Sequence, residues 1–313
     1  MVAFGGGTGL STLLRGLKNL NFEIIAVVAV TDEGGSSGRL RAELNVPPPG
    51  DVRNNFVALS CEEELLEKLF NFRFKNGSLQ GHTVGNVILA ALTMMNGNSL
   101  AKAVEVLSKI LAIKGRILPV SDELVRLVAI MEDGKEIIGE TKIVEYDQRI
   151  KEIRLDRQVE ALDEVLRSIE ESDLIIIGPG SLYTSVISNL LVKGVPETIN
   201  ASRARKIFIA NLMTQPGETT GMRLSDHVNE VERYLKGKVD YVVANTAKPP
   251  KEILERYEKE GYHPLCLDVQ NVDRLMILEP MISVVKDPFD PRPKLRHDAK
   301  KLAQVIMKIH MMG

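Results

Sequence analysis

The residues Val2-Ala3-Phe4-Gly5-Gly6-Gly7-Thr8-Gly9-Leu10-Ser11 decide the fold of this chain. A short apolar strand runs into a glycine-rich turn, and leucines at 10, 13, 14 and 17 then follow at helical spacing. Glycine leaves room for a ligand, and the free N–H groups of a helix N-terminus attract anions. We expect this turn to bind phosphate through Gly6, Gly7, Thr8, Gly9 and Leu10. A turn whose glycines serve only tight packing is the alternative.

The sequence of the turn differs from two common nucleotide-binding motifs. Gly5 and Gly7 match the first two glycines of G-x-G-x-x-G, but Leu10 stands at the third. The Gly-Lys-Ser/Thr of a Walker loop is missing, because no lysine is present in the turn. The turn therefore indicates phosphate or nucleotide binding, and Leu10 argues against a standard dinucleotide-binding oxidoreductase.

The composition is typical of a globular protein, with 313 residues, 44% of them hydrophobic and 26% charged. Its 40 basic and 42 acidic residues nearly balance, so nothing favours a nucleic-acid or membrane surface. No apolar run approaches the roughly 18 residues of a spanning helix, and we expect no membrane insertion. A chain that begins inside a strand argues against a signal peptide. We expect a cytoplasmic protein in which Cys61 and Cys266 are core residues.

Acidic residues follow the second apolar strand, which we expect over residues 24–30 and which completes a βαβ unit. Asp32 stands where such folds hold ribose hydroxyls, although it could instead bind a metal or cap a turn. Prolines at 47–49 stiffen the next loop, and Asp51 is predicted to cap the helix after it. We expect ligand contacts from Asp32, Arg39, Asp51 and Asn54. Asp32 and Asp51 are candidate Mg²⁺ ligands, and the sequence indicates no other cofactor.

Helices are predicted over 62–73, from the Gly81–Asn86 stretch to about Met95, and over 99–112. His82 and Asn86 stand four residues apart and are expected on one face near the start of the second helix. His82 is equally well interpreted as a capping residue or a ligand contact.

A small antiparallel insertion is predicted over residues 114–155, because the apolar period changes to two. Strands at 125–130 and 135–138 flank Asp133-Gly134, a strong hairpin signal. Further strands are expected at 142–144 and 151–155. The insertion could be a lid, an oligomer contact or a plain appendage. Residues 1–113 and 156–313 would then form the nucleotide-binding domain.

The parallel pattern returns after a helix at 158–171, with strands at 174–177, 207–210 and 241–244. Helices near 226–235, 250–259 and 297–309 and short strands near 264–268 and 275–279 complete the chain. Five strands thus lead into polar loops, and ligands of open parallel sheets bind at that edge. We expect a three-layer α/β/α fold with a mainly parallel sheet and a crevice for a phosphorylated ligand. The loops after the strands at 174–177 and 207–210 contribute further predicted ligand contacts: Gly180, Ser181, Tyr183, Thr184, Asn211, Thr214 and Gln215.

Catalytic signatures are missing from this pattern. The sequence holds no H-E-x-x-H, no metal-spaced Cys/His cluster and no G-x-S-x-G elbow. No general base is identified beside Ser181. The chain therefore indicates nucleotide binding more clearly than it indicates a reaction.

Motifs along nearly the whole chain resemble one family, the YvcK branch of the CofD-like superfamily, whose members are called gluconeogenesis factors. They lie at residues 5–11, 32–41, 47–54, 81–86, 178–185 and 213–215. The resemblance implies a Rossmann-like fold and a cytoplasmic regulator that binds UDP-sugars, notably UDP-N-acetylglucosamine, and that supports gluconeogenic growth and cell shape. A late-helix tyrosine and the arginine of a Leu-Arg-His motif are tied to UDP-sugar binding in that branch. They match Tyr257, with Tyr262 close by, and Arg296. We also expect a homodimer.

The sister branch is an enzyme and supplies the alternative. With Mg²⁺, this enzyme transfers a phospholactyl group from a guanosine diphosphate carrier to a deazaflavin alcohol. Like this chain, it has an acidic residue after the second strand. Its Asn-Thr-Gly-Asp-Asp motif is replaced here by Thr31-Asp32-Glu33-Gly34-Gly35, and its Ser-Pro-Asp stretch by residues 49–53. These departures argue against transferase activity.

Overall fold

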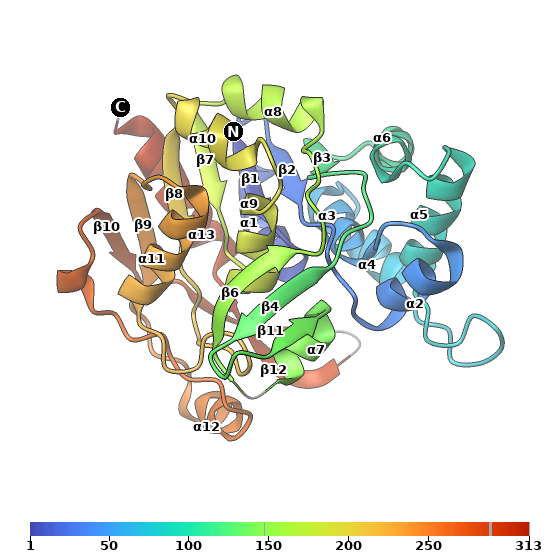
Figure 1. Cartoon of the computed structure of the whole chain (residues 1–313). Coiled ribbons are helices and arrows are strands. Elements are labelled where there is room, and N and C mark those ends of the chain that lie inside the picture. The colour runs from blue at the N-terminus through green and yellow to red at the C-terminus, as the bar shows by residue number, and fades with distance from the viewer. Residues whose placement is uncertain (147, 288–289, 313) are drawn as a thin grey trace.

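A seven-stranded sheet forms the centre of the computed structural model, which describes residues 1–146, 148–287 and 290–312 (Figure 1). Its order is β10-β9-β8-β7-β1-β2-β3, and every neighbouring pair is parallel. The strands are β1 (Val2–Gly5), β2 (Ile25–Val28), β3 (Arg116–Pro119), β7 (Leu174–Ile177), β8 (Arg205–Ile209), β9 (Tyr241–Asn245) and β10 (Leu275–Glu279). The five strands expected to lead into polar loops are adjacent, so their carboxyl ends share one edge.

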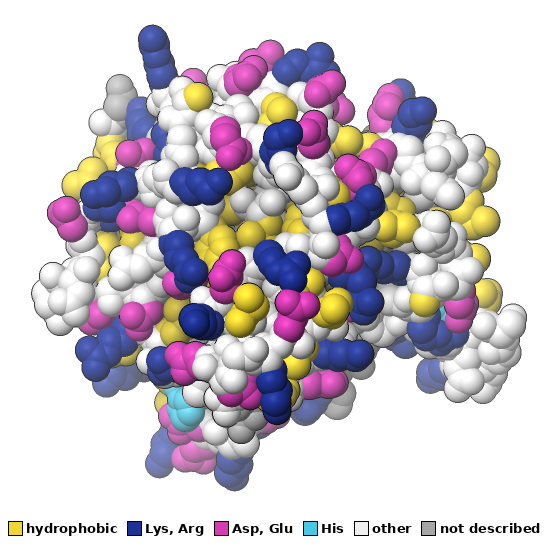
Figure 2. Space-filling view, viewed as in Figure 1, with side chains coloured by type: hydrophobic (Ala, Val, Ile, Leu, Met, Phe, Trp, Pro, Cys, Tyr) yellow, Lys and Arg dark blue, Asp and Glu magenta, His cyan; other side chains and the backbone are white. Residues whose placement is uncertain are grey.

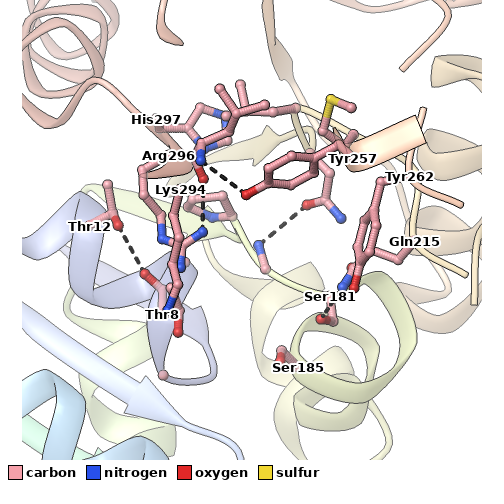
Figure 3. A pocket seen from close by; sticks show the side chains of 18 of the residues that line it. Thr8, Thr12, Ser181, Ser185, Gln215, Tyr257, Tyr262, Lys294, Arg296 and His297 are labelled. Atoms are coloured by element: carbon pink, nitrogen blue, oxygen red, sulfur yellow. Dashed lines mark hydrogen bonds between the residues drawn. The ribbon is translucent and has the colours of Figure 1, made fainter. Parts of the chain in front are cut away.

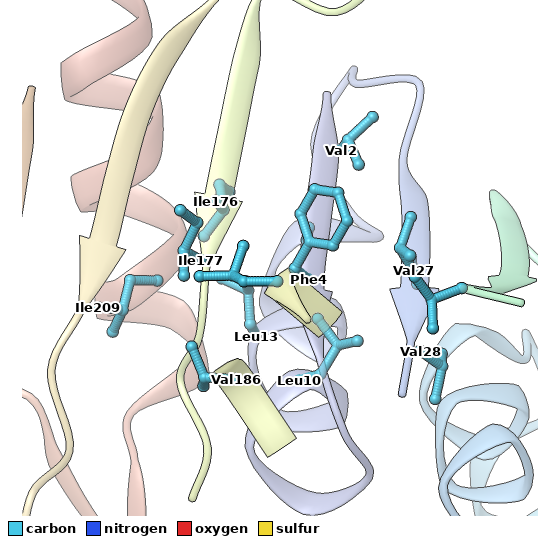
Figure 4. Packing of buried hydrophobic residues seen from close by; sticks show 14 of the residues in the cluster. Val2, Phe4, Leu10, Leu13, Val27, Val28, Ile176, Ile177, Val186 and Ile209 are labelled. Atoms are coloured by element: carbon cyan, nitrogen blue, oxygen red, sulfur yellow. The ribbon is translucent and has the colours of Figure 1, made fainter. Parts of the chain in front are cut away.

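Helices cover both faces of this sheet, as is typical of parallel sheets, whose apolar strands are buried on both sides. One layer contains α1 (Thr8–Leu17), α3 (Gly50–Leu59) and α13 (Ala299–Met311), and α1 packs against both of the others. The other contains α8 (Asp163–Glu170), η1 (Leu182–Ile187), α9 (Ser188–Leu190), α10 (Val195–Ala201) and α11 (Leu224–Leu235). Phe4 of β1, Leu10 and Leu13 of α1 and Ile177 of β7 meet in the fully buried core (Figure 4). The predicted three-layer α/β/α fold is confirmed.

Four further helices extend the α3 side of the molecule: α2 (Gly35–Leu44), α4 (Glu63–Asn71), α5 (Val84–Met95) and α6 (Leu100–Leu111) (Figure 1). Among the described residues, no single helix is long and apolar enough to cross a membrane. The α5–α6 pair reaches that threshold together on length and composition alone, with a bend of 119° between the two helices.

The antiparallel sheet of the insertion consists of β4 (Leu127–Met131), β5 (Glu136–Ile138) and β6 (Ile150–Leu155). The hairpin at Asp133-Gly134 is confirmed, with Gly134 at a φ of +85°. The strand expected at 142–144 is wrong, because Gly139 turns the chain at positive φ and α7 (Glu140–Glu145) follows with Ile143 buried. Residues 116–119 belong to the large sheet as β3, so the antiparallel strands themselves begin later than residue 114.

The secondary structure of the C-terminal part differs most from the one predicted from the sequence. Strands β11 (Ile282–Asp287) and β12 (Asp290–His297) form a hairpin that the sequence does not predict, since β12 holds two prolines and prolines argue against strands. Residues 264–268 form only isolated bridges, to Met213 and Arg223, between α12 (Lys251–Lys259) and the short η2 helix (Val269–Asn271).

Both cysteines, Cys61 and Cys266, are exposed, so the expectation of core cysteines is wrong. On the face shown in Figure 2, basic and acidic side chains are interspersed, in keeping with the balanced net charge.

Candidate functional site

A cavity of about 450 Å³ opens at the carboxyl edge of the sheet, where β1, β7 and β8 end. The loops after these strands form its floor, and α12 and β12 form the opposite wall (Figure 3). The sequence-predicted residues that line it are Gly7, Thr8, Gly9, Asp51, Gly180, Ser181, Asn211, Gln215, Tyr257 and Arg296. Ligands of open α/β sheets bind in this position.

The glycine turn brings the N-terminus of α1 to the cavity. Gly7 is the N-cap, and Thr8 and Gly9 are the first two helical residues. Their N–H groups have no carbonyl partner inside the helix, and the dipole favours an anion there. Thr12, one turn later, also lines the cavity and donates its hydroxyl to the Thr8 carbonyl at 2.9 Å.

Close packing explains part of the glycine content of this turn. A Cβ on Gly9 would lie 2.2 Å from the Pro179 carbonyl oxygen, and one on Gly6 would lie 2.7 Å from Asp51 Oδ2. Gly6 lies outside the cavity lining, and the Leu10 side chain is fully buried in the core. The glycines therefore allow the loops to touch, and the helix N-terminus faces the cavity.

The loop after β7 contributes Gly180 and Ser181, and η1 contributes Ser185. Gln215 Nε2 donates to Ser181 Oγ at 3.0 Å, and the Gly180 N–H donates to Asn211 Oδ1 at 3.4 Å, so this loop and the loop after β8 hold each other.

Three predicted residues of these two loops lie behind the cavity. The Thr184 hydroxyl donates to the buried Glu218 at 2.9 Å, and the Tyr183 N–H donates to the same carboxyl group at 3.1 Å. Thr214 is buried, and its hydroxyl donates to the His263 carbonyl at 3.3 Å. Tyr183, Thr184 and Thr214 therefore support the loops that line the cavity and do not line it themselves.

The opposite wall is basic and aromatic. Arg256 and Tyr257 come from α12, and Arg292, Lys294 and Arg296 come from β12. The Tyr257 hydroxyl accepts the Leu295 N–H at 3.0 Å and so joins α12 to β12. The Tyr257 and Tyr262 rings pack edge to face with centroids 5.6 Å apart, and both side chains face the cavity (Figure 3).

Two carboxyl groups, those of Asp51 and Glu140, line the cavity beside the glycine turn. Burial, and then repulsion from Asp32, raise the pKa of Asp51 to about 8. Burial, followed by repulsion from Asp32 and Asp51, raises the pKa of Glu140 to about 9. Burial also raises the pKa of Asp32, although its carboxylate accepts the Gly34 N–H at 2.8 Å.

A divalent cation would have few protein ligands here. In the described part of the chain, no group of three or more His, Cys, Asp or Glu side chains is spaced to hold a metal ion. Mg²⁺ often takes only one or two carboxylates and completes its shell with phosphate oxygens and water. Asp51, with Asp32 behind it, fits that kind of site, in which the ligand's phosphates would complete the shell.

Asp51 does not cap α3 as predicted. Pro49 is the N-cap, and Asp51 lies in the first turn with its side chain directed toward Gly7. The first-turn position still places a carboxylate near the positive end of the helix.

The remaining predicted residues form a polar cluster outside the cavity lining. His82 precedes α5 and does not cap it, because Thr83 is the N-cap. His82 Nδ1 lies 3.0 Å from Ser36 Oγ, and Arg53 donates to Asn86 Oδ1 and Asn54 Oδ1, each at 3.0 Å. Arg39 donates to the Gln80 carbonyl at 2.6 Å.

Several lining residues were missed by the sequence analysis. Thr12 and Ser185 repeat Thr8 and Ser181 one helical turn later, a spacing that could have identified them. Glu140 lies in a helix where a strand was expected nearby, and Lys294 lies in a strand that was not predicted. Arg256 stands beside Tyr257 in a helix that was predicted, but no local pattern singled it out.

The parallel sheet, the helix N-terminus and the basic wall together define a Rossmann-like α/β protein with a polar cavity at the carboxyl edge of its sheet. Residues 1–284 match the family described as 2-phospho-L-lactate transferase CofD, and the chain belongs to this CofD family.

Relatives agree over nearly the full length. The chain is 59% identical over 310 residues to a Thermotoga maritima protein named "Putative gluconeogenesis factor", covering 99% of this chain and 98% of that protein. It is 45% identical over 311 residues to the Bacillus subtilis "Gluconeogenesis factor", covering 98% and 96%. A crystal structure of a UPF0052 family member from Bacillus halodurans superposes with a TM-score of 0.91 at 43% identity, covering 98% of both chains.

Proposed function

We propose that the cavity binds a UDP-sugar, UDP-N-acetylglucosamine in particular, and that the protein acts as a cytoplasmic regulator of gluconeogenic growth and cell shape. One observation carries the proposal: the N-terminus of α1 and the basic residues of β12 face the same cavity as Tyr257. A helix N-terminus and arginine side chains are suited to a diphosphate, and tyrosine rings are suited to a base or a sugar face. The choice of a UDP-sugar among nucleotides comes from the resemblance to the YvcK branch.

The cavity volume of about 450 Å³ supports a ligand of this size, since small-molecule sites span roughly 300–1,000 Å³. The gluconeogenesis-factor names of the relatives support the regulatory role. A homodimer belongs to the proposal as an expectation that sedimentation would test.

A second candidate function is a Mg²⁺-dependent phosphotransferase of the 2-phospho-L-lactate transferase kind. The family match and the pocket-facing Asp51 beside Asp32 favour it. Against it, His297 is the histidine among the described lining residues, its Nε2 atom has no hydrogen-bond partner among the described residues, and burial lowers its pKa to about 4.

A thermal-shift screen separates the two functions. The purified protein would be heated with UDP-sugars, GDP, GTP or NAD, each with and without Mg²⁺. A ligand at about 100 times its Kd stabilises the fold by roughly 2.7 kcal/mol, which is readily measured. A shift confined to UDP-sugars supports the regulator, and a Mg²⁺-dependent shift with guanine nucleotides supports the transferase.

A further inference from the structure

The antiparallel insertion contributes a side chain to the cavity. Glu140 is the first residue of α7 and lies in the cavity lining, opposite the basic wall. The insertion approaches closely here, because a Cβ on Gly139 would lie 2.2 Å from Glu33 Oε2. The segment therefore forms part of the site as well as a separate small sheet.

Glu33, in the loop after β2, fixes the position of Glu140. Its carboxylate accepts the Arg126 Nε–H at 2.7 Å, and Arg126 immediately precedes β4 of the insertion. Its backbone N–H donates to Glu140 Oε2 at 3.2 Å. Among the described residues no hydrogen bond reaches Glu140 Oε1, so this oxygen can pair with a bound molecule.

The chemistry of this carboxyl group selects which part of a ligand lies against it. Phosphate groups are better placed at the α1 N-terminus and the basic side chains of β12. A half-buried carboxyl group that two other acids, Asp32 and Asp51, already repel is a poor neighbour for a further anion but a good partner for hydroxyl groups. Its raised pKa keeps it protonated near neutral pH, so it can both donate to and accept from a hydroxyl.

We propose that Glu140 hydrogen-bonds sugar hydroxyls of the bound nucleotide, so that the insertion helps to determine which nucleotide sugars the site accepts. This inference rests on the proposed function. The hydroxyls belong either to the ribose or to the sugar attached to the diphosphate, and both sources share the same chemistry.

Calorimetry with three variants and three ligands tests this role. Glu140→Ala and Glu140→Gln would be titrated with UDP-N-acetylglucosamine, UDP and 2′,3′-dideoxy-UDP, in EDTA and again with Mg²⁺. The matched control is Glu136→Gln, whose side chain lies on β5 and pairs with Arg154 at 2.8 Å. Removing Glu140 leaves the Glu33 N–H without its carboxylate partner, so the melting temperature of each variant is measured to check that it remains folded.

Glu140→Ala should weaken UDP-N-acetylglucosamine binding about tenfold or more, as expected when a buried hydroxyl loses its partner. Glu140→Gln should keep part of this affinity, and Glu136→Gln should change nothing. A loss confined to the sugar-bearing ligand supports the attached sugar. A loss that UDP shows and dideoxy-UDP does not supports the ribose.

Equal losses for all three ligands, or no loss, would overturn the role of Glu140. A loss that appears only with Mg²⁺ would also overturn it, because Glu140 would then act through the cation. Wild-type protein that binds no UDP ligand would overturn the proposed function itself, and this outcome is distinct from the others.

Discussion

The Asp51 carboxylate fills the space beside the Gly7 backbone: a Cβ added to Gly7 would lie 2.4 Å from Asp51 Oδ1. The same Cβ would lie 2.5 Å from Asn54 Nδ2. Gly7 caps α1 and Asp51 lies in the first turn of α3, so the absence of one side chain lets two helix N-termini meet at the cavity. The glycine turn and the Asp51 carboxyl group are therefore one structural unit.

Gly7→Ala should lower the free energy of unfolding by about 1–3 kcal/mol, the usual cost of overpacking. Urea unfolding followed by circular dichroism measures this change. In an Asp51→Ala background the cost should fall, because one of the two clashing groups is gone. An identical cost in both backgrounds would show that the Gly7–Asp51 contact is not the cause.

The first βαβ unit and the sheet edge were predictable because their signals are local. Leu174–Ile177 is an uninterrupted apolar run, and the glycine turn stands directly between a strand and a helix. Asp133-Gly134 identified its hairpin for the same reason.

Residues such as Glu140 and Lys294 could not be predicted, because their roles depend on tertiary contacts. Lys294 lies in β12, whose prolines conceal a strand, and Glu140 lies in a short helix whose β-branched residues are typical of a strand. Asp51 lines the cavity, but its predicted N-cap role is wrong, because capping propensity describes only the local chain.

Arg296→Ala should weaken UDP-sugar binding by about 1.5–3 kcal/mol, roughly tenfold or more, through the loss of a charge-assisted contact to the diphosphate. Isothermal titration calorimetry measures the affinity. Arg154→Ala is the control, because Arg154 lies on β6 and pairs with Glu136 outside the cavity. Unchanged affinity in Arg296→Ala would remove this residue from the ligand contacts.

The substitution Asp51→Asn should reduce the fall in the free energy of unfolding as the pH rises toward 8. The folded protein keeps Asp51 protonated up to its raised pKa of about 8, whereas the unfolded chain loses this proton near pH 4. The folded state therefore binds more protons between these values, and stability falls as the pH rises, by up to about 1.4 kcal/mol per pH unit. Unfolding free energies at pH 6.5 to 8 should decline less in the variant, and parallel declines would contradict the assignment.

The substitution His227→Leu should reduce the loss of folding stability at acidic pH. His227 is fully buried in α11, and neither ring nitrogen has a hydrogen-bond partner within the described residues. Burial lowers its pKa to about 4, so between pH 6.5 and 4 the unfolded chain binds the extra proton and stability falls on acidification. The loss of stability between pH 7 and pH 5 should be smaller in the variant. Part of the loss should remain, because burial lowers the pKa of His297 in the same way. An unaltered loss would refute the contribution of His227.

The most direct test of the central claim is calorimetric titration of the wild-type protein with UDP-N-acetylglucosamine in EDTA, beside a titration with GDP and Mg²⁺. We predict saturable binding of UDP-N-acetylglucosamine at one site per chain, tighter than that of GDP and independent of the metal. No binding of the UDP-sugar, or tighter Mg²⁺-dependent binding of GDP, would contradict the nucleotide-sugar site and favour the transferase.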